Sequence, residues 1–546
     1  MEGRNNMAPG GTLTVVAEDR VWNLTGAGGR TMLELLVEAG IEGYVSPCGG
    51  NGLCGKCLVR ISEGTAGAVH DDEHRLLTPA QLQDGLRLAC RMKYDGDADL
   101  TITLLDASAR GNILTTFNNE MPCGTPRRHY HAETYGCAID IGTTTIVVYL
   151  VRLDTRQVIG HRSAMNRQRS HGADVISRIQ YAQEHPDGTR ILQHAIVGQL
   201  DAMIGDLLTS HGIPSEAISE LVAVGNPTMI HLLVGADTSG IGAAPFTCAF
   251  TEPRSLRGVD IGLDNARHAH LELPGAVAAY VGSDITSGVH AANIMRSGKP
   301  VLYIDIGTNG EIVLWDGKRL SACASAAGPA FEGAAIRHGL GAVPGAIDHI
   351  WHHPDGRIAW STIGAQDAHG ICGSGIVDTM ALLLDLGLVD ETGAMDTSHP
   401  NADRYLTDSP DGLALRITDT IHFTRTDVRE VQLAKAAIAA GAQVLLDAAG
   451  LASDELEGIV IAGGFGSYID IASAQRIGLL PPVSPFRISV VGNAAGKGAL
   501  ELLMFDGVQG QIEQIRTAIA YIELSSSPAF QQQYVSHMYF GEDPDA

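Results

Sequence analysis

The chain has 546 residues, 45% of them hydrophobic, and a formal net charge of −25, because 62 acidic residues outnumber 37 lysines and arginines. A chain of this length predicts several domains, since one domain commonly spans about 100–200 residues. The acidic charge argues against nucleic acid and an anionic membrane as partners. No run of about 18 apolar residues predicts a transmembrane helix, and the first residues have no apolar signal-peptide core, so we expect a cytoplasmic protein.

The N-terminal region, 12–105, predicts a small metal-binding domain. A strand is expected from Thr12, a helix over 31–40 and a closing strand from Leu100. Between them lie four of the nine cysteines, spaced C-x5-C-x2-C with one more after a long gap. These cysteines are Cys48, Cys54, Cys57 and Cys90. In a reducing compartment they indicate metal or redox chemistry rather than disulfides.

Four thiolates are the ligands that a [2Fe–2S] cluster needs, two for each iron. Glycines around the first three cysteines let a loop wrap the cluster, with backbone N–H groups free to bond its sulfurs. The first gap is one residue longer than in the plant-type spacing. Zinc is the alternative, because four cysteines also make a tetrahedral zinc site. Zinc sites more often carry two paired C-x2-C arms, so the single distant Cys90 favours iron–sulfur.

Residues 106–134 predict a connector, because they carry Gly, Pro, Asn and charge without a clear period. Two roles stay open for it: a tether that lets the first domain move, or an ordered strap along the next domain. Cys123 is isolated within this stretch, and we do not assign it as a ligand.

Two copies of one hairpin dominate the rest of the chain. The stretches 136–150 and 301–315 each contain Ile-Asp-Ile-Gly-Thr, which places Asp140 and Asp305 at the ends of apolar strands. Two β-rich runs joined by a short glycine-containing turn predict a hairpin, and the N–H groups of such a turn form an anion-binding concavity. An aspartate at the strand end suits Mg²⁺ held through water. The repeat predicts two lobes that close on a nucleotide from both sides.

We therefore expect a first lobe over 135–300 and a second over 301–546, each a mixture of strands and helices. Glu332 lies in a glycine-rich loop of the second lobe, where it either orients Mg²⁺ or a water, or caps a following helix. A Gly-Gly-Phe-Gly-Ser turn after the strand at 456–462 offers flat backbone to adenine or ribose. No Walker A motif is present, so a P-loop enzyme is not expected.

The two hairpins and the Ala-Gly-Gly-Phe-Gly-Ser run at 462–467 resemble the actin, sugar kinase and Hsp70 superfamily of ATP-binding folds. Joined to the four-cysteine region, the whole chain resembles the reductive activators of corrinoid proteins. The stretches 224–231 and 328–333 add to this likeness. The resemblance implies an α/β multidomain fold, in which an N-terminal β-grasp [2Fe–2S] ferredoxin-like domain precedes a duplicated ribonuclease H-like ATPase.

The resemblance also implies an activity, the ATP-dependent one-electron reduction of Co(II) to Co(I) in a corrinoid protein, which restores a cobalamin-dependent methyltransferase system. It implies a [2Fe–2S] cluster, ATP and Mg²⁺ as cofactors. The implied partners are the corrinoid protein and an electron donor such as a reduced ferredoxin or flavoprotein, and a homodimer stays open. Because the cobalt step lies below the roughly −400 mV of a plant-type cluster, a nucleotide cycle would offset the uphill transfer.

Roles follow for individual residues. The catalytic candidates are Asp140, Asp305 and Glu332. The nucleotide-binding candidates are Gly142, Thr143 and Thr144 in the first hairpin, Gly307, Thr308, Asn309 and Gly310 in the second, and Gly463, Gly464, Gly466 and Ser467 at the adenosine turn. Cys48, Cys54, Cys57 and Cys90 are the expected cluster ligands.

Three other functions were weighed. An activator of radical dehydratases bridges two subunits with its cluster, whereas this chain carries a complete four-cysteine set in one domain. A carbohydrate kinase needs a catalytic base in a sugar pocket, and the sequence identifies none. A nucleotide-binding redox sensor would dock to a partner without reducing cobalt catalytically.

Overall fold

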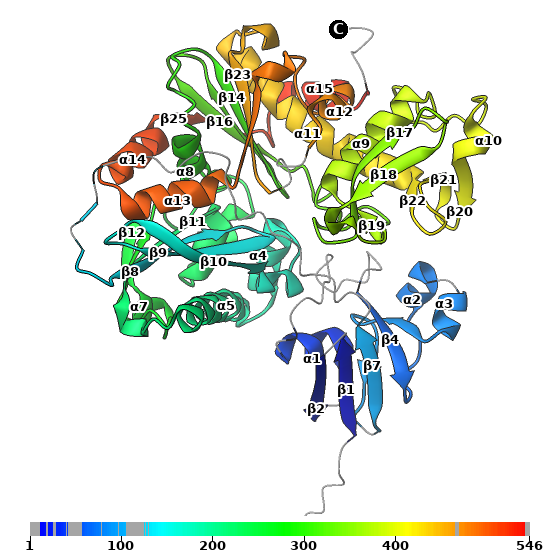
Figure 1. Ribbon diagram of the computed structural model, residues 1–546, viewed down its shortest axis with the longest axis horizontal. Coiled ribbons are helices and arrows are strands. Elements are labelled where there is room, and N and C mark those ends of the chain that lie inside the picture. The colour runs from blue at the N-terminus through cyan, green and yellow to red at the C-terminus, as the bar shows by residue number, and fades with distance from the viewer. Residues whose placement is uncertain are drawn as a thin grey trace, which may run out of the picture. The chain divides into compact units, whose positions relative to one another are not determined.

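A computed structural model of the chain describes residues 11–17, 20–25, 29–39, 41, 57–77, 79–96, 98–104, 125, 127–128, 130–464 and 469–540 (Figure 1). The chain divides into two compact units. One is drawn from Met1–Arg110 and Arg167–Tyr181, and the other from Gly111–Asn166 and Ala182–Ala546. Each unit has its own hydrophobic core and is described by itself.

The first unit is built on a five-stranded sheet in the order β2-β1-β7-β4-β5. β1 pairs antiparallel with β2 and parallel with β7, which is the central pairing of a β-grasp fold. Helix α1 packs on this sheet, because its apolar residues share one core cluster with those of β1 and β7. The elements are β1 (Thr12–Ala17), β2 (Arg20–Thr25), β3 (Arg30–Thr31), α1 (Met32–Glu38), β4 (Leu58–Glu63), α2 (Asp71–Leu76), α3 (Pro79–Gln83), β5 (Leu86–Leu88), β6 (Lys93–Tyr94) and β7 (Leu100–Leu104). The expected ferredoxin-like domain is confirmed.

The first lobe of the second unit is a six-stranded sheet in the order β10-β9-β8-β11-β13-β12. β8, β9 and β10 form an antiparallel meander, and β11 joins β8 in parallel. Helix α5 packs against β9 and β10. The elements are β8 (Tyr135–Ile141), β9 (Thr145–Arg152), β10 (Gln157–Met165), α5 (Gly188–His211), β11 (Ile218–Gly225), α6 (Pro227–Leu233), β12 (Arg254–Arg257), α7 (Gly258–Ile261), β13 (His270–Leu273) and α8 (Ser283–Ala292). Helix α4 (Val175–Glu184) crosses the boundary between the two units.

The second lobe repeats this plan in the order β24-β23-β14-β15-β16-β25. β14, β15 and β16 form the meander, and β23 joins β14 in parallel. The main elements are β14 (Val301–Ile306), β15 (Gly310–Trp315), β16 (Leu320–Ser325), α9 (Gly373–Asp385), α11 (Arg425–Ala449), β23 (Gly458–Ala462), α12 (Ile471–Arg476), β24 (Ile488–Gly492), α13 (Ala494–Met504), α14 (Val508–Ala518), β25 (Ile519–Tyr521) and α15 (Pro528–Ser536). Five strands correspond between the lobes, β16-β15-β14-β23-β24 in the second and β10-β9-β8-β11-β13 in the first, and this shared order confirms the expected duplicated ATPase fold. The sixth strand differs, because β25 pairs with β16 whereas β12 pairs with β13.

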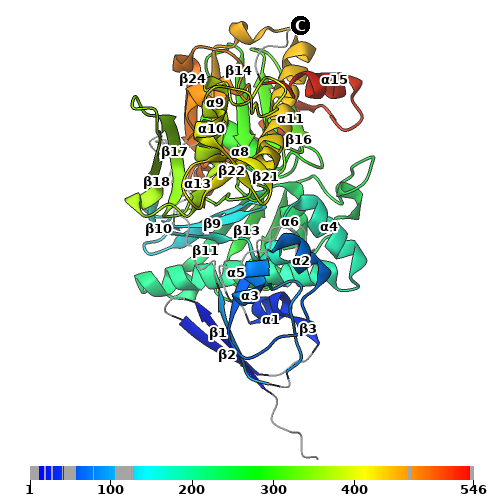
Figure 2. The ribbon, with the colours of Figure 1, turned by 90° about the vertical axis from the view of Figure 1, so that its right-hand side faces the viewer.

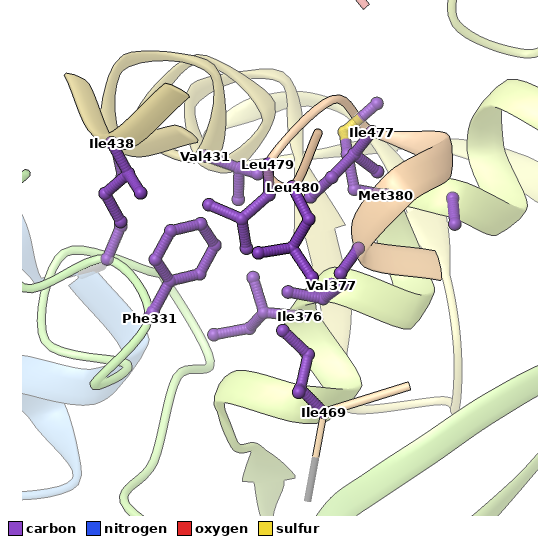
Figure 3. Packing of buried hydrophobic residues seen from close by; sticks show 14 of the residues in the cluster. Phe331, Ile376, Val377, Met380, Val431, Ile438, Ile469, Ile477, Leu479 and Leu480 are labelled. Carbon is purple, nitrogen blue, oxygen red and sulfur yellow. The ribbon is translucent and has the colours of Figure 1, made fainter. Parts of the chain in front are cut away.

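Two small sheets and a short helix lie between β16 and α11. They comprise β17 (Ala346–His352), β18 (Ile358–Thr362), β19 (Gly370–Ile371), α10 (Ala402–Tyr405), β20 (Leu406–Ser409), β21 (Gly412–Arg416) and β22 (His422–Thr424). Around α9 and α11 a large apolar core includes Phe331, Met380 and Ile438 (Figure 3). In the part of the chain that is described, α11 is the one helix long and apolar enough to cross a membrane, and most of it is buried in this core.

Each lobe contributes one helix that packs against the other lobe. α8 ends the first lobe in sequence, yet its Ile285 and Val289 share a core cluster with Val313 of the second lobe. α13 belongs to the second lobe in sequence, yet its Leu503 packs with Val222 of the first. Figure 2 shows the two lobes one above the other, with α8 and α13 between their sheets. The pair of helices therefore links the lobes mechanically.

Candidate functional site

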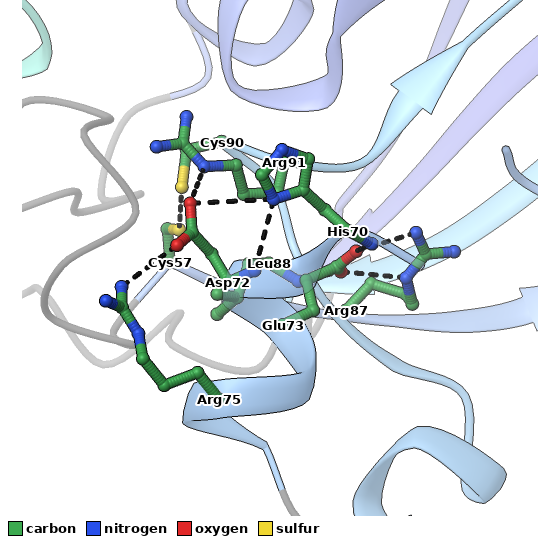
Figure 4. A network of polar contacts seen from close by, with 9 residues as sticks. All are labelled: Cys57, His70, Asp72, Glu73, Arg75, Arg87, Leu88, Cys90 and Arg91. Atoms are coloured by element: carbon green, nitrogen blue, oxygen red, sulfur yellow. Dashed lines mark hydrogen bonds and ion pairs between the residues drawn. The ribbon is translucent and has the colours of Figure 1, made fainter. Parts of the chain in front are cut away.

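Cys57 and Cys90 lie side by side at the end of two neighbouring strands. Cys57 directly precedes β4, and Cys90 follows β5. The Ala89 N–H donates to the Cys57 carbonyl oxygen over 2.8 Å, and the two sulfurs come within 3.2 Å (Figure 4). That distance exceeds the roughly 2.05 Å of a disulfide, so the two thiols are neighbours without a bond between their sulfurs. The other two expected ligands, Cys48 and Cys54, lie outside the described residues.

Ion pairs fix the turn that carries the second cysteine. Glu73 accepts hydrogen bonds from Arg87 (Nε, 2.8 Å; Nη2, 2.9 Å) and from the Leu88 N–H (2.9 Å). Burial by itself would raise the pKa of Glu73, but the guanidinium and backbone donors outweigh it and lower that pKa. Arg91 Nε donates to Asp72 over 2.7 Å on the other side of the turn (Figure 4). The end of β5 is therefore held in place without any bound group.

The two glycine hairpins of the second unit meet at one point. Thr144, after β8, and Thr308, after β14, each donate from Oγ1 to the same Glu332 oxygen over 2.9 Å. Their hydroxyls lie 3.1 Å apart. We call these three residues the hairpin junction. The alternative that Glu332 caps a following helix is wrong, because the described residues after it form turns as far as β17.

Four acidic side chains, here called the acidic cluster, influence one another beside the junction: Asp140, Asp284, Asp305 and Glu311. Burial raises the pKa of Asp305 to about 6 and that of Asp140 to about 7. Burial and the charges of Asp305 and Asp140 raise the pKa of Asp284 to about 8. Burial, with Asp284 and Asp305 nearby, raises the pKa of Glu311 well above its usual range. Such a cluster favours a bound cation.

The cation that fits this cluster is one that keeps its hydration. Among the described residues, no group of three His, Cys, Asp or Glu side chains could hold a metal ion directly. Mg²⁺ usually keeps several waters and is held by one or two carboxylates together with substrate phosphates. The acidic cluster therefore suits hydrated Mg²⁺ carried in with a phosphate ligand better than a dedicated metal site.

Two asparagines at helix N-termini support the hairpins. Asn226 caps α6 and donates from Nδ2 to Thr143 Oγ1 over 2.9 Å. Asn493 caps α13, and its side-chain amide beside the Asp140 carboxylate lowers the pKa of Asp140 against the effect of burial. A helix N-terminus also places backbone N–H groups and the positive end of the helix dipole near a phosphate.

Glycine is required where β23 ends. Gly463 has φ +93°, and a Cβ there would lie 2.6 Å from the Ile306 carbonyl oxygen and 2.8 Å from Asp305 Oδ1. This glycine lets the predicted adenosine turn approach the second hairpin closely. Glycine is needed at position 310 for a different reason, because a Cβ there would lie 2.8 Å from Ile438 of α11. Packing against the core accounts for Gly310.

The structure thus brings Asp140, Thr143, Thr144, Asp305, Thr308 and Glu332 to one place, from two hairpins and a loop far apart in sequence. Asn309 hydrogen-bonds Glu311 in the same hairpin. Gly142 and Gly307 occupy the two turns, and a Cβ at Gly464 would meet open space. Gly466 and Ser467 lie outside the described residues, as does Cys123.

Four residues of the site had no role assigned from the sequence: Asn226, Asp284, Glu311 and Asn493. Sequence signals existed for some of them. Asn226 and Asn493 both follow a glycine at the end of a strand, and Asp284 opens a helix after another glycine. Glu311 sits inside the second hairpin motif, one position after Gly310.

Comparison with known proteins gives matches over nearly the whole chain. Family models described as the 2Fe-2S iron-sulfur cluster binding domain, the RACo middle region and the C-terminal domain of RACo, the ASKHA domain, match residues 19–95, 135–297 and 299–545. The Corrinoid activation enzyme RamQ of Eubacterium limosum is 35% identical over 432 residues, which cover 77% of this chain and 72% of that protein.

Two further matches agree with it. The [Co(II) methylated amine-specific corrinoid protein] reductase of Methanosarcina barkeri is 24% identical over 446 residues, covering 74% of this chain and 77% of that protein. A solved structure of a reductive activator for corrinoid, iron-sulfur protein superposes with a TM-score of 0.69 at 30% identity, covering 97% of this chain and 98% of that one.

Proposed function

This chain belongs to the family of reductive activators of corrinoid proteins, and we propose that it reduces the Co(II) of a corrinoid protein to Co(I) with one electron in an ATP-dependent reaction. The electron enters from a low-potential donor such as a reduced ferredoxin or flavoprotein. The electron is then transferred to cobalt, so that the donor is oxidised by one electron and the cobalt is reduced by one. The nucleotide supplies the free energy and is hydrolysed to ADP and phosphate.

The observation that carries the proposal is the hairpin junction. Thr144 and Thr308 come from different lobes and donate to one carboxylate oxygen of Glu332 over 2.9 Å. Hydroxyl donors aimed at one oxygen from two sides form a clamp for a phosphate oxygen. Asp140 precedes Thr144 in the first hairpin and Asp305 precedes Thr308 in the second, and hydrated Mg²⁺ bound there would neutralise both carboxylates. A ligand held by both lobes favours the arrangement of lobes that it fits, which is how binding is converted into a conformational shift.

The first unit supplies the electron carrier. A [2Fe–2S] cluster, when bound, carries one electron at a time. Cys57 and Cys90 fit as ligands of one of its irons, because their sulfurs are 3.2 Å apart on a turn already fixed by ion pairs. Each roughly 59 mV that an electron must climb to its acceptor costs a factor of ten in the equilibrium of a one-electron step. Nucleotide turnover at the hairpin junction is proposed to offset that cost.

The proposal is tested by adding the purified protein, excess chemical reductant and MgATP to a corrinoid protein in the Co(II) state, and recording the Co(I) absorbance. We expect many Co(I) per activator with ATP and few without it. Cys57→Ala should lose the cluster absorbance and the activity, while ATP binding remains. Cys248→Ala, which changes a cysteine outside the four-cysteine set, is the matched control. A normal iron content in Cys57→Ala, or equal rates with and without ATP, would refute the proposal.

A further inference from the structure

The connector between the two units is anchored on the helix that begins at the nucleotide site. We propose that α13 transmits the state of the nucleotide site to this connector, and that Arg127 is the positioning residue that couples them. The inference rests on the proposed function, because it supplies the physical link between ATP and the domain that carries the electron.

One end of α13 touches the acidic cluster. Asn493 is the N-cap of this helix, and its side chain accepts from the Gly496 N–H over 2.7 Å. The same side chain donates from Nδ2 to the Tyr149 hydroxyl over 3.4 Å, and it lies close enough to the Asp140 carboxylate to lower the pKa of Asp140. Any change in the charge or position of Asp140, such as the arrival of Mg²⁺ and phosphate, therefore acts directly on the first turn of α13.

The body of α13 has little freedom to deform or rotate. All of its residues from Ala494 to Met504 are buried. A Cβ at Gly498 would lie 2.3 Å from the Ser287 carbonyl oxygen of α8, so the two helices are in backbone contact. A Glu501 carboxylate oxygen also lies 3.1 Å from Nε2 of His290 on α8. Packed elements of this kind shift as rigid pieces rather than bend, so a displacement at the first turn reaches the last.

The other end of α13 holds the connector through Arg127. The Arg127 N–H donates to the Met504 carbonyl oxygen over 3.0 Å, and its Nη1 donates to the Leu502 carbonyl oxygen over 3.2 Å. Its Nη2 forms an ion pair with Glu272, which is buried on β13 of the first lobe. The Asp506 N–H donates to the Thr125 carbonyl oxygen over 2.9 Å just beyond the helix. The described end of the connector is therefore fixed to α13 and to β13 of the first lobe.

The charges at this anchor suit a coupling role. Arg127 satisfies carbonyl groups at the C-terminus of α13, where a helix leaves its last carbonyls unpaired and favours a cation. Its side chain is only 11% exposed and that of Glu272 only 6%, so the pair is shielded from solvent. A shift of α13 would stretch these bonds or carry the connector along with it. Either result ties the connector to the nucleotide site.

The neighbouring arginine provides a matched control. Arg128 pairs with Glu220 of β11 over 2.6 Å, at the sheet rather than at α13, and its side chain is 54% exposed. It has the same charge, the adjacent position and a similar buried glutamate as partner. A variant at Arg128 thus removes an arginine–glutamate pair from the connector but leaves the helix contact.

The first test compares Arg127→Gln with Arg128→Gln in the full-length protein. We expect Arg127→Gln to keep its cluster absorbance and its ATP hydrolysis, while ATP-stimulated Co(I) formation falls about tenfold, within the range of coupling between two sites. Arg128→Gln should stay within about twofold of the parent in both reactions. An unchanged Co(I) rate in Arg127→Gln would overturn the inference. A parallel loss of ATP hydrolysis would overturn it too, because Arg127 would then act on the nucleotide site itself.

The second test needs no variant and separates this inference from the proposed function. Hydrogen exchange is measured on the unmodified protein with and without MgATP. We expect exchange to slow or quicken by about fivefold or more at the hairpin peptides and also at the Arg127 and Asp506 amides. A response at the hairpins alone would overturn the coupling and leave the proposed function standing. No response anywhere would overturn both.

Discussion

The β8–β9 and β14–β15 hairpins share the residues Ile-Asp-Ile-Gly-Thr, yet they turn and pair differently. In the first, Ile141 pairs with Ile146, whereas in the second Ile306 pairs with Gly310, so the second turn is one residue shorter. A one-residue change of register moves a different side chain opposite each position of the partner strand. Identical motifs therefore do not give identical sites.

The register decides what faces each aspartate. Val147 lies opposite Asp140, whereas Glu311 lies opposite Asp305. Asp140 is supported instead by the neutral amide of Asn493. The second hairpin consequently concentrates negative charge, and the first is less charged. We therefore propose that the second hairpin supplies most of the carboxylates for a bound cation, while the first mainly positions phosphate.

The largest effect is expected from a variant of the second hairpin. Asp305→Ala should lower ATP-stimulated Co(I) formation by about 100-fold or more, as expected when a principal electrostatic contact in a shielded site is lost. Asp140→Ala should cost less, about tenfold, because Asp305 and its neighbouring carboxylates remain. The cluster absorbance should be intact in both variants, since the cysteines belong to the other unit.

Steady-state Co(I) formation with saturating MgATP measures these losses. Asp264→Ala is the control, because that aspartate is 78% exposed and pairs only with a surface arginine. Equal losses in the two hairpin variants would contradict the asymmetry between the hairpins. Unchanged ATP-dependent activity in Asp305→Ala would remove this aspartate from the mechanism.

A moderate effect comes from pH. Burial raises the pKa of Asp305 to about 6 and, with nearby charges, that of Asp284 to about 8, so the folded protein keeps protons that the unfolded chain has already released. The free energy of unfolding without ligand should therefore fall as the pH rises from about 5 to about 8. MgATP needs the ionised carboxylates, so its Kd should tighten by up to about tenfold per pH unit in this range.

Calorimetric titration of MgATP at pH 6 and pH 8 measures this dependence. Glu311→Gln removes the carboxylate that lies opposite Asp305, so the pH dependence should become shallower in that variant. Val147→Ile, at the matching place of the first hairpin, should leave it unchanged. An unchanged dependence in Glu311→Gln would mean that Glu311 does not contribute to the charge of the site.

The smallest effect tests the turns themselves. A Cβ at Gly142 would lie 2.6 Å from the Thr145 carbonyl oxygen, but at Gly307 it would lie 3.7 Å from that of Asn309, an ordinary contact. We expect Gly142→Ala to lower the free energy of unfolding of the ATPase unit by about 1–3 kcal/mol, the usual cost of overpacking. Gly307→Ala should change it by less than about 0.5 kcal/mol. Denaturant unfolding measures both, and a reversed order would show that the turns are not as described.

Much of the fold was predictable because its signals are local. The strand that ends at Asp140, the strand that ends at Asp305 and the long helix α11 are visible as apolar runs, and the turn residues between them are distinctive. The cysteine spacing predicted the first unit for the same reason. The loop of Glu332 was predicted beside the phosphate site because it follows the strand that comes after the second hairpin.

The rest of the site is not local. Asp284 and Asn493 reach it only because α8 and α13 cross between the lobes, and nothing in either helix indicates which sheet it will cover. Both helices are buried over most of their length, yet α8 carries more polar than apolar side chains and the apolar pattern of α13 names no partner. In the sequence, Arg127 is likewise only one charged residue in an irregular stretch. Its role depends on a carbonyl group 375 positions further along the chain.

The central claim is that electron transfer from the cluster unit to cobalt depends on the nucleotide site of the second unit. It is tested most directly in a single turnover, with protein reduced beforehand, freed of reductant and mixed with a Co(II) corrinoid protein while cluster and cobalt absorbances are followed together. We predict that adding MgATP produces one Co(I) for each cluster oxidised, and that without MgATP neither signal moves appreciably. The same transfer at the same rate without nucleotide would contradict the account.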